Sequence, residues 1–178
     1  MNLRGTLGIL ALAFASGLGG YFAYFHLQHA EHQQDLPAPA PDVRLTDLGG
    51  AERRLDEWQG QWLLVNFWAS WCPPCIKEIP VLVDAQQRWA ARGLQIIGPA
   101  MDAPDTTRDM ARRLGVNYPV MAGDQAVSRA MTALGDTLGA LPFSVLIDPA
   151  GQIVARHYGE FDAVKLEKLL KAHVKGDF

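Results

Sequence analysis

The pattern of apolar and polar positions divides most of the chain into strands and helices. Residues 43–47 alternate between apolar and polar and are followed by two glycines, which predicts a strand and a hairpin turn. Residues 62–69 and 94–98 are β-prone apolar runs typical of buried central strands, and 72–91 between them has the length of a helix, interrupted or kinked at Pro80. Because two strands joined by one helix form a βαβ unit, we expect these two strands to be parallel.

The second half of the chain adds helices and a second hairpin. The expected elements, in chain order, are a helix at 105–114, an extended piece at 118–121, a helix at 126–134 and strands at 144–148 and 152–157. A Pro-Ala-Gly turn joins the last two strands, and an amphipathic helix capped by Asp162 ends the fold. This order of elements predicts an α/β sandwich with a central mixed sheet.

The beginning of the chain has a different pattern. Residues 5–25 carry no formal charge, and a helix of that length spans about 31 Å, close to the hydrocarbon thickness of a bilayer. Arg4 precedes the segment and no Lys or Arg follows until Arg44. By the positive-inside rule we expect residues 1–4 in the cytoplasm, a single-pass transmembrane signal anchor at 5–25 in the cytoplasmic membrane, and the remainder in the periplasm or extracytoplasmic space. The alternative is a signal peptide cleaved after an Ala-Phe-Ala site, although the apolar segment before that site would be short.

A linker is predicted at residues 26–41, between this anchor and a folded domain at 42–178. Alternating prolines near its end favour an extended, semi-rigid spacer. His26, His29 and His32 recur at spacing three without other ligands, so we expect a polar stalk and no metal site. The formal net charge of −3 gives no reason to expect a nucleic-acid partner.

The only two cysteines in the 178 residues lie three apart, in Trp71-Cys72-Pro73-Pro74-Cys75. They follow the first predicted central strand, so Cys72 stands at a helix N-terminus, where free N–H groups and the helix dipole favour a thiolate. We therefore expect a reversible dithiol/disulfide pair that needs no other cofactor: Cys72 is the exposed nucleophile that attacks a disulfide, and Cys75 resolves the mixed disulfide. A purely structural bridge is disfavoured because so short a loop removes little chain entropy.

Residues 65–75, Val-Asn-Phe-Trp-Ala-Ser-Trp-Cys-Pro-Pro-Cys, resemble the active-site segment of thioredoxin-like proteins, and more closely that of the membrane-anchored TlpA/ResA group of thiol-disulfide oxidoreductases. The resemblance covers roughly residues 37–174 and includes the segment 98–120 and Leu141-Pro142 before a strand. It implies a thioredoxin-like fold and a protein-disulfide reductase tethered on the outer side of the cytoplasmic membrane. The implied partners are client proteins with cysteine disulfides and a membrane dithiol electron donor, with cytochrome c or copper-site biogenesis as candidate settings.

The resemblance also assigns a role to Glu78, which lies three residues after Cys75 on the same face of the predicted helix. The corresponding glutamate of TlpA/ResA-like proteins is implicated in proton transfer, and Asn66 stands where cytosolic thioredoxins have a titratable aspartate. We expect Glu78 to exchange a proton with Cys75 as the disulfide opens. The alternative is that Glu78 is only a favourable charge in the first turns of the helix.

The predicted client-binding residues are Trp71, Pro73, Pro74, Leu141 and Pro142. Pro142 resembles the cis-proline that faces the active site of thioredoxin-like folds, where the backbone of Leu141 would pair with an extended client. Trp71 offers apolar contact surface beside the thiols. Because Pro73 and Pro74 have no N–H, they leave the thiolate with few backbone donors, which predicts a reducing potential nearer to roughly −270 mV than to roughly −120 mV.

Three other functions are compatible with the same fold. A disulfide-forming oxidase or isomerase would use the same cysteine pair, although the Pro-Pro dipeptide argues against it. A non-redox, chaperone-like binding module would use the groove beside Pro142, although an intact cysteine pair disfavours it. A peroxiredoxin-like peroxidase is the last alternative, which turnover of a hydroperoxide would reveal.

Overall fold

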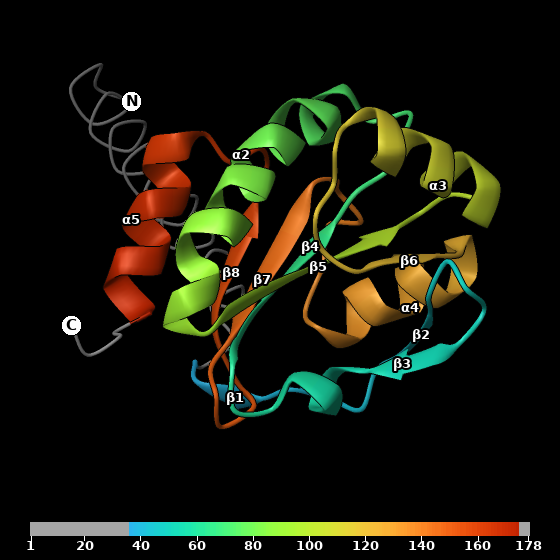
Figure 1. Ribbon diagram of the computed structural model, residues 1–178. Coiled ribbons are helices and arrows are strands. Elements are labelled where there is room, and N and C mark those ends of the chain that lie inside the picture. Colours follow the sequence, from blue (N-terminus) through green and yellow to red (C-terminus); the bar gives the residue numbers. More distant parts are fainter. Residues whose placement is uncertain (1–35, 175–178) are drawn as a thin grey trace, which may run out of the picture. The chain divides into compact units, whose positions relative to one another are not determined.

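Within residues 36–174, which the computed structural model describes, a six-stranded mixed β-sheet forms the centre of the structure (Figure 1). In spatial order its strands are β1 (Ala38–Pro39), β8 (Gln152–Tyr158), β7 (Phe143–Ile147), β4 (Trp62–Phe67), β5 (Leu94–Ala100) and β6 (Val120–Ala122). β5 runs parallel to both β4 and β6, whereas β7 and β8 form an antiparallel hairpin beside β4. The predicted mixed sheet, its parallel central pair and its second hairpin are confirmed.

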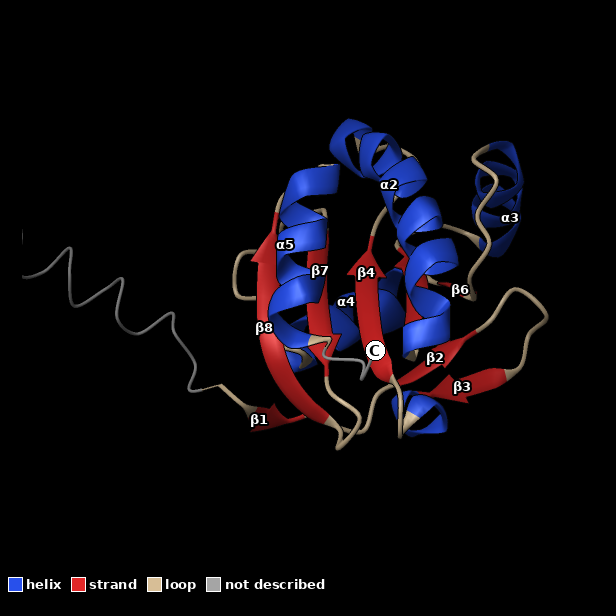
Figure 2. Ribbon diagram, turned by 60° about the vertical axis from the view of Figure 1, so that its left-hand side comes forward, coloured by secondary structure: helices blue, strands red, loops and turns tan. Residues whose placement is uncertain are grey.

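Helices cover both faces of the sheet (Figure 2). α2 (Pro73–Trp89) and α5 (Ala163–His173) lie over one face, and α4 (Asp124–Ala133) lies over the other. The remaining elements are the helix α3 (Pro104–Arg113), the 3-10 turns η1 (Leu55–Trp58) and η2 (Ala90–Arg92), and the two-stranded hairpin of β2 (Arg44–Thr46) and β3 (Glu52–Arg54). The positions of α3, α4, α5 and the first hairpin agree with the sequence-based predictions.

The alternation of side chains along the strands sorts the buried residues into two apolar clusters. Leu64 and Leu146 belong to the cluster beneath α2 and α5. Val65 and Val145 belong to the cluster beneath α4. Because successive strand residues point to opposite faces, Asn66 lies on the same face as Leu64, and a polar side chain is therefore enclosed beneath α2.

The helix α2 continues through Pro80 without a break, so of the two expected effects of this proline, an interruption or a kink, the interruption does not occur. Pro80 lacks the N–H of an ordinary helical residue and removes one hydrogen bond from the ladder. Its neighbours Ile79 and Leu82 are fully buried in the cluster beneath the helix. This packing outweighs the loss of one bond, since most helix stability in proteins comes from tertiary contacts.

The predicted domain start at residue 42 is too late. Ala38 and Pro39 form β1, which pairs antiparallel with Ile153 and Gln152 of β8. A proline-rich segment is already extended, and a proline without an N–H is tolerated on an outer strand, so the end of the predicted linker joins the sheet. The predicted anchor at 5–25 and the three linker histidines lie outside the described residues, and no helix within residues 36–174 has the length and apolar character of a membrane span.

Candidate active site

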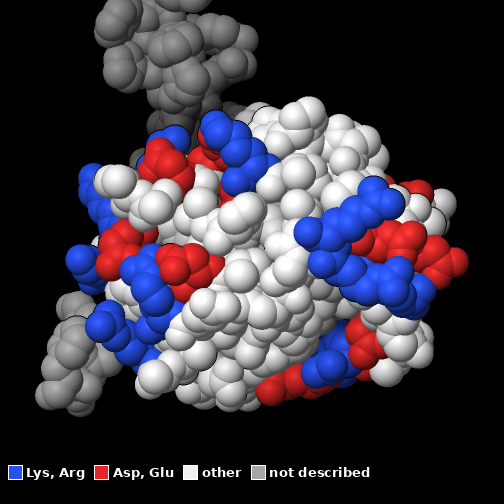
Figure 3. All heavy atoms as spheres, turned by 45° about the horizontal axis from the view of Figure 1, so that its top comes forward, with Lys and Arg blue, Asp and Glu red and all other residues white. Residues whose placement is uncertain are grey.

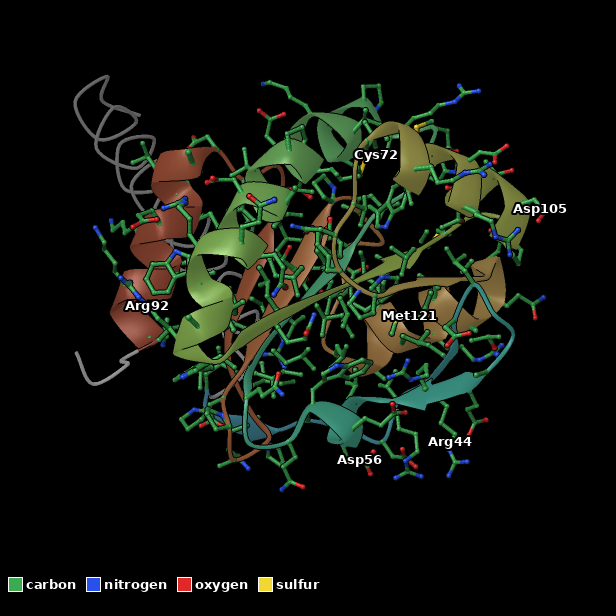
Figure 4. The ribbon with its side chains drawn as sticks, in the orientation of Figure 1. Arg44, Asp56, Cys72, Arg92, Asp105 and Met121 are labelled. Atoms are coloured by element: carbon green, nitrogen blue, oxygen red, sulfur yellow. A yellow bond between two sulfur atoms is a disulfide. The ribbon has the colours of Figure 1, made fainter. Side chains whose placement is uncertain are left out.

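The two cysteines lie where β4 leads into α2, at one end of the sheet (Figure 4). Cys72 is the N-cap residue of α2 and is joined to Cys75 by a disulfide, with the two Cα atoms 5.3 Å apart. The backbone N–H of Cys75 donates to the sulfur of Cys72 at 3.3 Å. Pro73 and Pro74 occupy the first turn between them, so this stretch of backbone offers Cys72 no other N–H donor.

Cys72 is less exposed than the sequence predicts. The surface of Cys72 is 5% exposed, and Cys75 is fully buried. Cys72 is thus the more accessible of the two cysteines, as expected, but it is not an exposed residue in the disulfide form. Both cysteines belong to the apolar cluster beneath α2, and Leu141 packs against the same cluster. Trp71, by contrast, is 64% exposed and presents its apolar ring to solvent beside the disulfide.

Asp102 fixes the turn before Cys72, which the sequence analysis did not predict. One carboxylate oxygen accepts the backbone N–H of Ser70 at 2.6 Å and the other accepts the Ser70 hydroxyl at 2.9 Å. Asp102 is itself buried and follows β5, while Ser70 follows β4. Because parallel neighbours end at the same edge of a sheet, a polar residue after each of two such strands was the available signal.

Glu78 lies one turn after Cys75 on α2 and is completely buried. Its Oε1 accepts the side-chain N–H of Asn66 at 2.7 Å, and its Oε2 accepts the backbone N–H of Phe161 at 2.7 Å. Burial raises the pKa of Glu78 to about 7, although these two hydrogen bonds oppose the change. Burial thus disfavours the charged form on which the alternative role, a favourable charge in the first helical turns, depends.

The second hydrogen of the Asn66 amide extends this network across the sheet. Asn66 donates to the hydroxyl of Ser144 on β7 at 3.0 Å. Asn66 and Ser144 are register partners in neighbouring strands, so their side chains lie on the same face. Neither Asn66 nor Ser144 titrates, which leaves Glu78 as the ionisable member of the network that lies nearest to the cysteine pair along α2.

Pro142 lies at the same end of the sheet, directly before β7. The Leu141–Pro142 bond is cis, as expected, and Phe143 directly after it pairs with Phe67 at the end of β4. The loop before this proline is exposed at Leu138, where 59% of the residue surface is accessible. The structure therefore brings the predicted client-binding residues to one end of the sheet, next to the cysteine pair.

A family model described as the AhpC/TSA family matches residues 37–156. The chain belongs to the AhpC/TSA family. It is 30% identical to the thiol-disulfide oxidoreductase ResA of Bacillus thuringiensis over 92% of each chain, and 27% identical to ResA of Bacillus subtilis over 76% of this chain and 74% of that one. The resemblance to ResA found in the sequence is confirmed.

Solved structures agree with this placement in the AhpC/TSA family. A thiol:disulfide interchange protein of the thioredoxin family from Chlorobium tepidum superposes with a TM-score of 0.68 at 29% identity, covering 80% of this chain and 99% of that one. The thioredoxin-like α/β fold is thus confirmed. Together with the Cys72–Cys75 disulfide, these relatives show that the protein is a thiol:disulfide oxidoreductase.

Proposed function

We propose that this oxidoreductase is an extracytoplasmic reductase of client disulfides, tethered to the cytoplasmic membrane by residues 5–25 and supplied with electrons by a membrane dithiol donor. The small number of hydrogen-bond donors to the Cys72 sulfur supports the assignment as a reductase. Its sulfur accepts the N–H of Cys75, and the two prolines contribute none. Strong oxidants of this fold are oxidants because their thiolate form is stabilised, so a thiolate with few donors gives up its electrons more readily.

Cys72 and Cys75 exchange two electrons with the client in two steps. The Cys72 thiolate attacks one sulfur of the client disulfide, the client S–S bond breaks, and the first client sulfur leaves as a thiolate that takes a proton from solvent. Cys75 then loses its thiol proton and attacks the Cys72 sulfur. The second client thiolate leaves, and the enzyme is left with the Cys72–Cys75 disulfide.

Glu78 accepts the Cys75 proton in the second step. It is one turn away on α2, and its carboxyl has a pKa of about 7, which suits an acceptor that must also return the proton. When the membrane donor reduces the enzyme, Cys75 leaves as a thiolate and takes the proton back from Glu78. The buried position of Glu78 keeps this exchange separate from bulk water.

The client binds at the uncharged surface around the disulfide. Trp71 and Leu138 supply exposed apolar side chains, and an extended client segment would pair with the backbone of Leu141. Figure 3 turns this end of the molecule toward the viewer and shows a broad uncharged area between clusters of charged side chains. Clients in cytochrome c or copper-site biogenesis are candidate partners, because unfolded precursors present cysteines in extended segments.

The reduction potential of the Cys72–Cys75 pair tests this proposal. The full-length protein in detergent is equilibrated with dithiothreitol or glutathione buffers, and the disulfide fraction is followed by tryptophan fluorescence. A potential below roughly −230 mV supports a reductase, and one above roughly −150 mV would mean that the pair donates disulfides. A Cys72→Ser variant with full biological activity would instead refute any redox role.

A further inference from the structure

The backbone of Ala140 and Leu141, directly before the cis Pro142, is free of hydrogen bonds. Within residues 36–174, no hydrogen bond uses the N–H or the carbonyl of either residue. Ala140 is exposed and Leu141 is half-buried, so an extended peptide could pair with this stretch as it would with an edge strand. Such a stretch binds well only if it is already held in the pairing conformation, because ordering it during binding costs free energy.

The end of α4 fixes the start of the loop that leads to this stretch. The helix ends at Ala133, and Gly135 has a positive φ of 97°. The N–H of Gly135 donates to the carbonyl of Thr132 at 3.0 Å, and the N–H of Asp136 donates to the carbonyl of Met131 at 2.9 Å. These two bonds form a Schellman motif, which glycine favours at this position. The backbone of Asp136 is therefore attached to the end of the helix.

The side chain of Asp136 holds the residues that follow it. Its Oδ1 accepts the backbone N–H of Leu138 at 2.9 Å and that of Gly139 at 3.1 Å. Asp136 is buried, whereas Leu138 and Gly139 are exposed, so the carboxylate holds the loop from the protein side. Aspartate stabilises turns in this way because its side-chain oxygen takes the place of a backbone carbonyl. Gly139 has a φ of 63°, a conformation that glycine adopts without strain.

The end of β8, which lies beside β7 (Figure 1), holds the same loop from the neighbouring strand. The hydroxyl of Tyr158 accepts the N–H of Thr137 and donates to the carbonyl of Gly135, both at 3.3 Å. After the free stretch, the carbonyl of Pro142 accepts the N–H of Gly159 at 2.9 Å. The unpaired backbone is therefore held on both sides.

We propose that Asp136 and Tyr158 are positioning residues for client reduction. They hold residues 137–141, here called the client loop, in the conformation in which its free backbone pairs with an extended client. The inference rests on the proposed pairing of clients with Leu141. Asp136 and Tyr158 act through the client loop and take no part in the exchange of electrons, so a small disulfide that reaches Cys72 without pairing with the loop does not need them.

Asp136→Ala tests the inference, because it removes the acceptor of two backbone N–H groups. The reduced full-length protein in detergent is mixed by stopped flow with a synthetic extended peptide that carries one disulfide, or with hydroxyethyl disulfide. Two ordinary hydrogen bonds correspond to a factor of about ten in an equilibrium constant. We therefore expect the half-maximal peptide concentration to rise about tenfold, while the maximal rate, the rate with hydroxyethyl disulfide and the reduction potential keep their wild-type values. Asp136→Asn keeps the Oδ1 acceptor and should restore most of the peptide binding.

Asp148 is the matched control, because its side chain makes the same two contacts in the turn after β7. Its Oδ1 accepts the N–H of Ala150 at 2.9 Å and that of Gln152 at 2.8 Å. Asp148→Ala should lose a comparable stability in urea unfolding without raising the half-maximal peptide concentration. An equal rise in both alanine variants would show that lost stability weakens peptide binding, and it would overturn the inference.

Tyr158→Phe carries the same test if Asp136→Ala does not fold. It removes the hydroxyl and keeps the ring on Phe143, where the two ring centroids are 4.8 Å apart, so we expect a severalfold rise in the half-maximal peptide concentration. Normal peptide binding by the Asp136 and Tyr158 variants, with Leu138→Ser impaired, would overturn the inference and leave the client surface in place. Normal binding by all three would overturn both the inference and the proposed pairing of clients with Leu141.

Discussion

Replacing Glu78 by Gln should change how the stability of the disulfide form depends on pH. In the folded chain this carboxyl has a pKa of about 7, against 4.5 for an ordinary glutamate, because it is enclosed beneath α2. The folded state therefore holds the proton over a range in which the unfolded chain has lost it. The stability that this provides is complete below about pH 4.5 and is lost as the pH rises to about 7.

The size of the change follows from the two pKa values. One pKa unit corresponds to about 1.4 kcal/mol, so the difference between about 7 and 4.5 gives about 3 kcal/mol. Gln cannot ionise and should lack this loss. The variant also exchanges one hydrogen-bond acceptor for a donor opposite Asn66 or Phe161, which costs about 1–3 kcal/mol at every pH. Only the pH-dependent part of the difference in unfolding free energy between the variant and the wild type measures the ionisation of the Glu78 carboxyl.

The assay is urea unfolding of the chain from Leu36 onward, with the disulfide intact, at several pH values between 4.5 and 8.5. The free-energy difference between the Glu78→Gln variant and the wild type should shift by about 3 kcal/mol in favour of the variant across this range. Glu52→Gln is the matched control, because the Glu52 side chain is 59% exposed. If the Glu78→Gln and wild-type curves run parallel, the buried carboxyl does not titrate in this window and its proposed role fails.

Two further substitutions test the support of the site and its client surface. Asp102→Ala leaves the N–H and hydroxyl of Ser70 without their acceptor, so we expect urea unfolding to show a loss of about 1–3 kcal/mol and stopped-flow to show slower client reduction. Ser70→Ala keeps the backbone hydrogen bond to Asp102 and should lose less stability. If Asp102→Ala is as stable as the wild type, the two hydrogen bonds from Ser70 do not stabilise this turn. Leu138→Ser removes an exposed apolar side chain from the loop before Pro142, so KM for a client peptide should rise severalfold while the reduction potential stays unchanged. Val164→Ser replaces an exposed apolar side chain on α5 and is the control, and an equal rise in KM there would show that Leu138 has no special part.

Periodicity predicted the strands and helices because each element is long enough to show its repeat. The pattern also placed the cysteine pair between a strand and a helix, which fixed the helix N-terminus and the proline-filled first turn. The contacts of Glu78 could not be read in this way. Ser144 is 78 residues from Asn66, and Asp102 is 32 residues from Ser70, so both partnerships depend on the register between strands. The local sequence around a polar residue in an apolar strand does not specify which residue of the adjacent strand will lie opposite it.

The exposure of Cys72 was overestimated for a related reason. A position at a helix N-terminus predicts access to solvent, but the loop before β7 places Leu141 against the same apolar cluster, and no local pattern indicates that contact. The start of the domain was missed because prolines were interpreted as a spacer. In the structure their extended backbone instead suits an outer strand, where Ala38 and Pro39 pair with β8.

The burial of Glu78 changes both the proton affinity of its carboxyl and the stability of the folded chain. An exposed carboxyl with a pKa near 4.5 would be ionised at neutral pH and would return a proton to the Cys75 thiolate poorly. Burial beneath α2 brings the carboxyl near 7 and, by the same free energy, destabilises the folded chain at neutral pH. The hydrogen bonds from Asn66 and Phe161 oppose that change and keep the carboxyl in one orientation. If an aspartate stood at residue 66, a second ionisable group would share the proton, whereas Asn66 does not titrate, so the stability loss and the proposed proton transfer both belong to the carboxyl of Glu78.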